Sequence, residues 1–373
     1  METSGPTGAG ARQRSSVGRV HPTDHADLRA RVGKALAAFL TDQRALLRGI
    51  DPALADVADA IDDFVLGGGK RLRPAFAYWG YRAAGGVDDD AVVAAVAALE
   101  LVQASALMHD DLIDGSDTRR GEPAVHRRFA TRHAGSGWQG GADAFGAAAA
   151  VLLGDLCLVW SDQLLHTSGL DGTAIARARP VFDLMRTEVT IGQYLDVHTQ
   201  VTGDTSLRRA STVARYKSAK YTVERPLLLG AAIAGAPAAI SAGLSDYGLP
   251  LGEAFQLRDD VLGVFGDPAT TGKPAGDDLR EGKRTYLVAA AFDAADRTRA
   301  DALRAGLGDP DLSGDEVTRL RDIIVDTGAL ARTERRIDDL TTTALAALDA
   351  LPIDPGAAAV LRDLASAATR RTF

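Results

Sequence analysis

Two clusters of aspartates are the side chains of this sequence best suited to chemistry. The first comprises Asp110, Asp111 and Asp114, and the second comprises Asp259 and Asp260. Each cluster is followed along the chain by basic residues, which are Arg119, Arg120, Lys273 and Lys283. Clustered carboxylates repel one another unless cations lie between them, and ligand sets made only of oxygen select hard ions such as Mg²⁺. Because guanidinium and ammonium groups suit a polyanion, the pattern predicts a metal-dependent enzyme that acts on diphosphates.

The first cluster has the spacing of a helical metal site. Residues four apart share a helix face, so Asp110 and Asp114 should project together and hold metal ions. Asp111 is rotated by about 100° and should lie behind the ligands or face the substrate. A solvated helix end is the alternative, but aspartates are unfavourable at the carboxyl end of a helix. We therefore favour the metal site.

The second cluster offers fewer ligands. Asp259 has Gly263, not a carboxylate, four residues further on, so Asp259 should hold one ion with help from Asp260. An aspartate pair before a glycine-rich loop is by itself equally typical of a helix terminus. Its interpretation as a metal site depends on the first cluster.

Composition and charge exclude several classes of protein. The chain has 373 residues, 46% of them hydrophobic, and a net charge of −8, which argues against a nucleic-acid-binding protein. The single cysteine, Cys157, lies in an apolar run and predicts a buried core thiol in a reducing compartment. There is no secretory signal, and the apolar stretches look too short or too interrupted for membrane spans. We expect a cytoplasmic protein that is not integral to a membrane.

The elements that must position these residues are helices. Apolar residues recur every three or four positions from residue 24 onward, and strand patterns are nearly absent. The spacing predicts helices over 28–47, 88–109, 144–168, 173–198, 206–220, 221–235, 238–263, 284–306, 314–328, 329–349 and 355–369. Residues 1–23 predict a disordered tail, and 24–373 predict one all-α domain, since one site needs both clusters.

Four motifs in order resemble the trans-isoprenyl diphosphate synthases of the polyprenyl synthetase family. They are Gly-Gly-Lys-Arg-Leu-Arg-Pro at 68–74, Asp-Asp-Leu-Ile-Asp with Arg-Arg-Gly at 119–121, Lys217-Ser218, and Phe-Gln-Leu-Arg-Asp-Asp with the later Gly-Lys-Pro and Gly-Lys-Arg-Thr. The resemblance implies a helical bundle of the isoprenoid synthase type around a central cavity. It also implies Mg²⁺-dependent, head-to-tail condensation of isopentenyl diphosphate with dimethylallyl, geranyl or farnesyl diphosphate through an allylic carbocation.

The resemblance assigns roles to individual residues. Asp110, Asp114, Asp259 and Asp260 would hold Mg²⁺, three ions in all, with Asp111 beside them. The isopentenyl diphosphate site would be formed by Lys70, Arg73, Gln103 and Arg120, with help from Arg71. The shell around the allylic diphosphate would consist of Arg119, Lys217, Ser218, Gln256, Lys273 and Lys283. Two positions depart from the commonest family pattern: Gly263 replaces a third aspartate, and Ser218 stands where threonine is usual.

Product length should follow from the depth of an apolar tunnel behind the first cluster. In this family a bulky aromatic four or five positions before that cluster stops chain growth early, whereas here those positions hold Ala106 and Ser105, with Val102 further back. Small residues predict an open tunnel and a geranylgeranyl (C20) product, with C15 or longer products left open.

Other classes remain as alternatives. A class I terpene cyclase shares one aspartate motif and an all-α fold but does not need the Lys70, Arg73 and Arg120 set. A non-catalytic partner subunit of a prenyl synthase would usually lack aspartates that are present here. No P-loop supports a kinase or hydrolase. The family resemblance further implies a homodimer.

Overall fold

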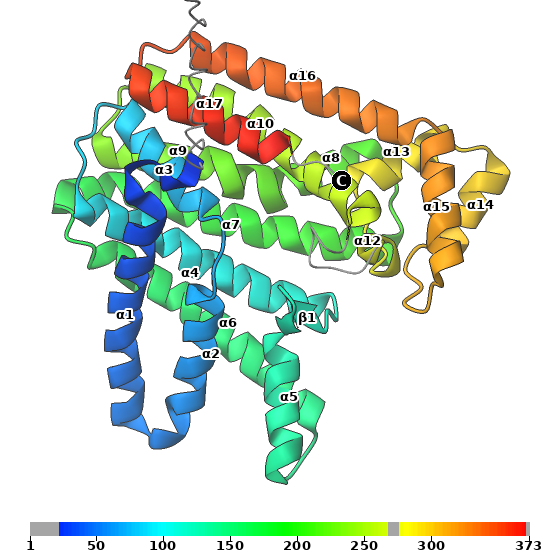
Figure 1. The fold of residues 1–373 in the computed structure, drawn as a ribbon, viewed down its shortest axis with the longest axis horizontal. Helices are drawn as coiled ribbons and strands as arrows, with labels where there is room; N and C mark the ends of the chain where they lie inside the picture. The colour runs from blue at the N-terminus through cyan, green and yellow to red at the C-terminus, as the bar shows by residue number, and fades with distance from the viewer. Residues whose placement is uncertain (1–21, 268–275, 371–373) are drawn as a thin grey trace, which may run out of the picture.

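The computed structural model describes residues 22–267 and 276–370, and nearly all of them are helical (Figure 1). The first half contains η1 (Pro22–Asp27), α1 (Leu28–Ile50), η2 (Pro52–Leu54), α2 (Ala55–Leu66), α3 (Leu72–Ala83), α4 (Asp90–Ile113), β1 (Thr118–Arg119), β2 (Glu122–Pro123), α5 (Val125–Ser136) and α6 (Ala142–His166). The second half contains α7 (Gly172–Thr202), α8 (Leu207–Val213), the π-helix η3 (Ala214–Glu224), α9 (Arg225–Ala234), α10 (Ala238–Phe265), α12 (Asp277–Arg280), α13 (Tyr286–Ala294), α14 (Arg297–Gly306), α15 (Gly314–Asp326), α16 (Ala329–Asp349) and α17 (Pro355–Thr369). The all-α prediction is confirmed.

Helix α4 lies at the centre of the bundle and delivers the first aspartate cluster. The side chain of Asp89 accepts a hydrogen bond from the backbone N–H of Ala91 and so caps the start of the helix. Its apolar residues are buried against neighbours that include α1, α3 and α6. Most of α4 is packed within the core, so the helix gives Asp110, and Asp114 at its end, a rigid support.

Two glycines allow η3 to pack between α7 and α10. A Cβ at Gly192 on α7 would overlap the backbone of Lys217, and a Cβ at Gly252 on α10 would overlap the backbone carbonyl of Ala219. No larger side chain fits at either position without moving the backbone. This close packing places Lys217 opposite the end of α4.

A second apolar cluster supports the far end of α10. It joins Val261 and Val264 to side chains of α13, α15 and α16, including Leu287, Leu320 and Ile337. The second aspartate cluster is therefore also mounted on a helix that is packed on several sides.

Several helix predictions need correction. The helix predicted over 284–306 is two helices, because the chain breaks after Ala294 and Asp296 caps a new helix that begins at Arg297. The helix predicted over 206–220 ends at Val213 and continues as the π-helix η3. The apolar patterns also do not predict α2, α3 and α5.

The predicted domain boundaries can be examined only within the described residues. Residues 1–21 of the predicted tail lie outside the described residues. Thr23, which the prediction assigns to the tail, is buried and accepts a hydrogen bond from Arg29. The interpretation of 24–373 as one domain stays a prediction.

Two of the described helices, α4 and α6, are long and apolar enough to cross a membrane by length and composition, which differs from the sequence expectation. In α4, 72% of the most apolar window is buried within the bundle, whereas in α6 only 33% is. Helix α4 is therefore a core helix. Helix α6 presents apolar side chains at the surface, among them Val151, Leu152 and Val159.

Candidate active site

A cavity of about 1260 Å³ brings the predicted site residues together from across the sequence. Its walls come from α3, α4, α6, α7, α8, η3 and α10 and from the segments that flank them. The predicted residues that line it are Lys70, Arg73, Val102, Gln103, Ser105, Ala106, Asp110, Arg119, Lys217, Ser218, Gln256, Asp259, Asp260 and Lys283. Lys273 lies outside the described residues. Asp110 of the first cluster and Asp259 and Asp260 of the second therefore line one cavity, whereas Asp111 and Asp114 are not among the described residues that line it.

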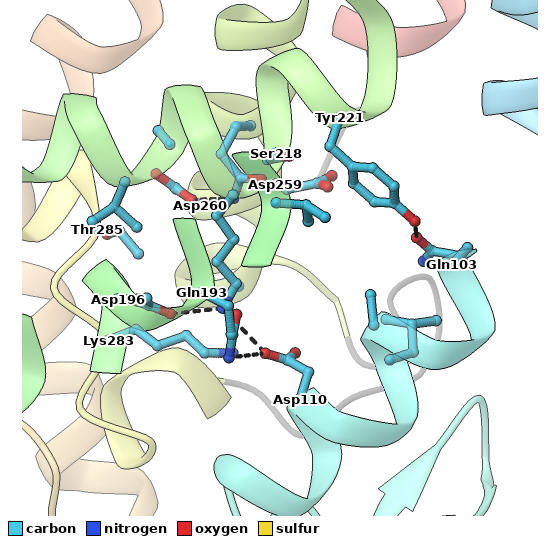
Figure 2. Close-up of a pocket in the computed structure, with 18 of the residues that line it drawn as sticks. Gln103, Asp110, Gln193, Asp196, Ser218, Tyr221, Asp259, Asp260, Lys283 and Thr285 are labelled. Atoms are coloured by element: carbon cyan, nitrogen blue, oxygen red, sulfur yellow. Dashed lines mark hydrogen bonds and ion pairs between the residues drawn. The ribbon is translucent and has the colours of Figure 1, made fainter. Parts of the chain in front are cut away.

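Asp110 is held by polar groups from two other helices. Its Oδ1 atom accepts hydrogen bonds from Nε2 of Gln193, at 2.9 Å, and from Nζ of Lys217, at 3.1 Å (Figure 2). Lys217 also donates to Asp196 at 2.6 Å. Burial opposes the ionisation of Asp110, but the charges of Lys217 and Lys283 outweigh burial, so its pKa is lowered. Asp110 is a stable carboxylate at neutral pH.

The pKa of Asp114 is shifted in the opposite direction to that of Asp110. It caps the end of α4, and its Oδ2 atom is buried with no hydrogen bond, 3.3 Å from Nζ of Lys283. Burial and the charge of Asp110 raise the pKa of Asp114 to about 6. An added cation next to Asp110 and Asp114 would relieve this repulsion.

Asp111 does not line the cavity but lies behind its wall, which is the first of the two positions that the sequence allows. Its side chain is 1% exposed and forms an ion pair with Arg119, with Nε of Arg119 at 2.9 Å. The rotation of one position along α4 turns it away from Asp110 and Asp114. Asp111 positions Arg119, which does line the cavity.

The second cluster lines the cavity from α10. Figure 2 shows Asp259 and Asp260 on a different wall from Asp110. Burial raises the pKa of Asp260 to about 8 despite a 2.7 Å hydrogen bond from Gln256, and the charges of Asp278 and Asp259 contribute to the increase. These acids also crowd one another in the absence of a cation.

The predicted isopentenyl diphosphate residues divide into two groups. Arg73 donates to Thr222 at 2.8 Å, and its guanidinium lies 4.3 Å from the ring centre of Tyr221. The Tyr221 hydroxyl donates to Oε1 of Gln103 at 2.7 Å (Figure 2). Together with Lys70, these side chains form one polar wall of the cavity.

Arg71 and Arg120 do not line the cavity. Arg71 is buried and donates to Glu100 and to the carbonyl of Val65, so the prediction that it helps to bind substrate is not supported by its position. Arg120 donates to the carbonyl of Gly68 at 3.1 Å, next to Lys70, and burial lowers its pKa. Arg120 therefore lies against the glycine-rich loop that carries Lys70.

Comparison with known proteins decides the family. The family model described as polyprenyl synthetase matches residues 55–324, which is more than half of the chain and includes both aspartate clusters. The chain belongs to the polyprenyl synthetase family. It is a prenyltransferase of the trans-isoprenyl diphosphate synthase type, which elongates prenyl chains.

Individual relatives agree with this membership. A geranylfarnesyl diphosphate synthase from Aeropyrum pernix is 33% identical over 72% of this chain and 79% of its own length. A geranylgeranyl diphosphate synthase from Mycobacterium tuberculosis is 33% identical over 75% of each chain. A crystal structure of geranylgeranyl pyrophosphate synthase from Corynebacterium glutamicum, complexed with isoprenyl diphosphate and magnesium, is 43% identical, with a TM-score of 0.89 over 95% of this chain and 100% of that one. These relatives are named for products of different lengths, so similarity alone does not fix the product.

Gly263, the departure from the commonest polyprenyl synthetase pattern, has a structural explanation. A Cβ at this position would overlap the carboxylate of Asp278, which lies against α10 there. Asp278 also lines the cavity, 3.8 Å from Lys283. A carboxylate from a later segment thus occupies the space of the missing side chain.

The sequence analysis missed two residues of this prenyltransferase site. Gln193 and Asp196 lie three apart on α7, and they contact Asp110 and Lys217 respectively. Their spacing on one helix face was the available signal. It was weak, because most polar residues on a long helix face solvent.

Proposed function

We propose that this prenyltransferase makes geranylgeranyl diphosphate (C20) from isopentenyl diphosphate and an allylic diphosphate, with Mg²⁺, as a cytoplasmic homodimer. One observation carries the proposal: a single cavity is lined by Asp110, Asp259, Asp260 and a set of cations, which we call its mouth, and by small side chains of α4, which we assign to its interior. A charged mouth fits two diphosphates, and an interior lined by small and apolar side chains fits a prenyl tail.

The aspartates fit a Mg²⁺ site that is completed by substrate. Among the described residues, no group of three or more His, Cys, Asp or Glu side chains is arranged to enclose an ion alone. Mg²⁺ is often held by only one or two carboxylates together with phosphates and water, and the raised pKa of Asp114 marks a place that needs positive charge. We assign the ions, three in number, to Asp110, Asp114 and Asp259, with Asp260 beside them. When bound, Mg²⁺ supplies positive charge that stabilises the departing diphosphate.

The cations of the chain hold and neutralise the two diphosphates. Lys70 and Arg73, with Arg120 at the adjacent loop and Gln103 on α4, bind isopentenyl diphosphate. The allylic diphosphate is held by Arg119, Lys217, Ser218, Gln256 and Lys283, with Lys273 as a further contact. Arg119 and Lys217 are fixed by Asp111 and Asp196 before substrate arrives, so little reorganisation is needed during the reaction.

The reaction breaks one bond and forms another. The bond between C1 of the allylic substrate and its diphosphate oxygen breaks, and the electron pair leaves with the diphosphate. The double bond of isopentenyl diphosphate attacks C1 through its C4 atom, and a proton is then lost from C2 to the released diphosphate. The side chains hold both substrates in line and exclude water from the carbocation.

The tail of the growing chain runs between α4, α6 and α7. Ala106, Ser105 and Val102 line the cavity, which supports this path for the tail. Each helical turn of about 5.4 Å corresponds to roughly one prenyl unit. No bulky aromatic blocks the first two turns of α4 below Asp110, which supports a product longer than C15.

The exposed apolar face of α6 is covered by a second copy of the chain. Leu152 is 65% exposed and Val159 is 63% exposed, and Leu184, Ile191 and Tyr194 of α7 add further exposed apolar area. Exposed apolar side chains in this number on two helices are typical of an interface. A homodimer buries them without a membrane, which is consistent with a cytoplasmic enzyme.

Incubation of the purified chain with labelled isopentenyl diphosphate tests the proposal. Dimethylallyl, geranyl and farnesyl diphosphates would be supplied separately, with Mg²⁺ and with EDTA, and the dephosphorylated alcohols would be sized. We expect C20 alcohol from all three primers and no incorporation with EDTA. Cyclic hydrocarbons from the allylic substrate alone would instead identify a cyclase, and a folded protein without incorporation would refute the proposal.

A further inference from the structure

One charged side chain that lines the cavity belongs to neither of the proposed diphosphate sites. Arg186 of α7 lines the cavity together with Leu158 of α6 and Val102 of α4. Gln193, which contacts Asp110 at the mouth, lies seven residues later on the same helix. At 1.5 Å per residue, the Cα of Arg186 is therefore about 10 Å further from the mouth. The sequence analysis does not predict a role for this residue.

The contacts of Arg186 connect α7 to α6. Its Nη2 atom donates to Oδ1 of Asp162 on α6, at 3.2 Å, and also to Asp183 on α7. Its guanidinium carbon lies 4.6 Å from the ring centre of Phe182. Only 21% of the Arg186 side chain is exposed. The guanidinium is thus held between α6 and α7 by two carboxylates and an aromatic ring.

This ion pair is separate from the charges of the mouth. Arg119, Lys217 and Lys283 pair with carboxylates of the first cluster and its surroundings. Asp162 and Asp183, in contrast, are not among the described residues that line the cavity. Arg186 therefore turns a charge toward an apolar space in which diphosphate binding does not require one.

We infer that Arg186, locked by Asp162 and Asp183, is the floor of the prenyl tunnel and determines where chain growth stops. This inference rests on the proposed function. Helical side chains lean toward the amino end of their helix, so the guanidinium lies roughly one turn below its own Cα, beside Phe182. The Gln193 side chain leans the same way, so the guanidinium lies about two turns of α7 below the Gln193 amide, which leaves room for about two prenyl units beyond the unit that lies beside Gln193.

The chemistry of the floor explains why it stops a hydrocarbon. A longer tail would have to push the guanidinium away from Asp162 and Asp183, which are partly exposed, and a hydrocarbon offers no hydrogen bonds in exchange. A farnesyl tail fits above the pair and receives one more unit, whereas a geranylgeranyl tail does not fit. Ala106 and Val102 leave the upper tunnel open, and Arg186 closes it further down.

Product sizing with Arg186 variants tests this inference. The assay would use farnesyl diphosphate as primer and an excess of labelled isopentenyl diphosphate. For Arg186→Ala and for Arg186→Met, which keeps an unbranched apolar stem but removes the guanidinium and its charge, we expect the ratio of C25 and longer products to C20 to rise about tenfold or more. Arg186→Lys retains the charge and is expected to keep C20 as the main product.

Arg179→Ala is the matched control. Arg179 also lies on α7 and pairs with Asp183 at 3.6 Å, but its side chain is 57% exposed and does not line the cavity. We expect this variant to keep the activity and the C20 product of the parent.

The outcomes separate the inference from the proposed function. If the parent elongates farnesyl diphosphate and both Arg186→Met and Arg186→Ala still stop at C20, the inference is wrong and the proposed function stands. If Arg186→Ala does not fold, as judged by circular dichroism, Arg186→Met alone decides. Absence of any incorporation by the parent would overturn the proposed function and this inference together.

Discussion

The mouth and the interior of the cavity differ in almost every physical respect. The mouth is built from charged and polar side chains of α4, α7, η3 and α10, and many of them are paired with one another, as Lys217 is with Asp110 and Asp196. The interior is built from small or apolar side chains of α4, α6 and α7, such as Ala106, Leu158 and Val189. The mouth thus provides electrostatic stabilisation and the interior provides shape.

This division has a consequence for mutation. Changes at the mouth should alter the reaction rate and leave the product length alone, because they act on the departing diphosphate. Changes in the interior should alter product length more than rate, because they act on the tail. The following experiments test whether reaction rate and product length can be changed separately.

The largest effect is expected for Asp110→Asn. This change removes a carboxylate assigned to Mg²⁺ and should lower kcat/KM by about 10²–10³-fold or more. The residual product should still be C20. Steady-state kinetics with sizing of the alcohols measures both quantities, and Asp301→Asn, an exposed position on α14, is the control. A shift in product length at a nearly normal rate would contradict the view that the mouth controls rate alone.

A somewhat smaller loss is expected for Lys217→Met. Lys217 is paired before substrate binds, and its positive charge should favour departure of the diphosphate, so its removal should cost about 10²-fold in kcat/KM. Lys34→Met, at an exposed position of α1, should behave as the parent does. An equal loss in both variants would mean that the effect does not come from the cavity.

Ala106→Phe should act on the interior. The added ring would fill the tunnel one turn below Asp110, so the main product should shorten to C15 or C10. The rate of the first addition to dimethylallyl diphosphate should fall by less than about tenfold, since one added group in an apolar pocket has modest effects. Ala305→Phe, exposed on α14, is the size-matched control. Unchanged C20 product from Ala106→Phe would refute the assigned path of the tail.

The smallest effect on chemistry is expected for Leu152→Glu on α6. A charge on the exposed apolar face should disfavour the proposed dimer, and light scattering should show the mass fall from about twice 39.0 kDa to that of one chain. Val87→Glu, at another exposed apolar position outside α6, should remain dimeric. A parent protein that is already monomeric would contradict the proposed use of this face.

The sequence predicted the mouth better than the interior for a physical reason. Asp110 and Asp114 are four residues apart, so their shared helix face can be read from the local sequence. In the structure both lie at the end of α4. The pairing of Arg71 with Glu100 is set by tertiary packing between residues 29 apart, and no local pattern indicates it. The position of Arg186 could not be predicted either, because an arginine on a long helix usually lies on a solvated face and not in a cavity.

The fold shows the same limit. The strongly periodic helices were predicted, but α3 contains Pro74 and Gly80 and was not. Gly80 is needed there because a Cβ would crowd the backbone of Leu227 on α9. The π-helix η3 likewise depends on close contact with α7 and α10 and not on its own sequence pattern.

The most direct test of the central claim compares two primers, farnesyl and geranylgeranyl diphosphate, in the same assay with labelled isopentenyl diphosphate and Mg²⁺. If the mouth promotes the reaction and the interior limits the length of the chain, farnesyl diphosphate should be elongated once, to C20. Geranylgeranyl diphosphate should incorporate little or no label. Elongation of geranylgeranyl diphosphate as fast as farnesyl diphosphate would contradict the account, because the interior would then not limit the chain.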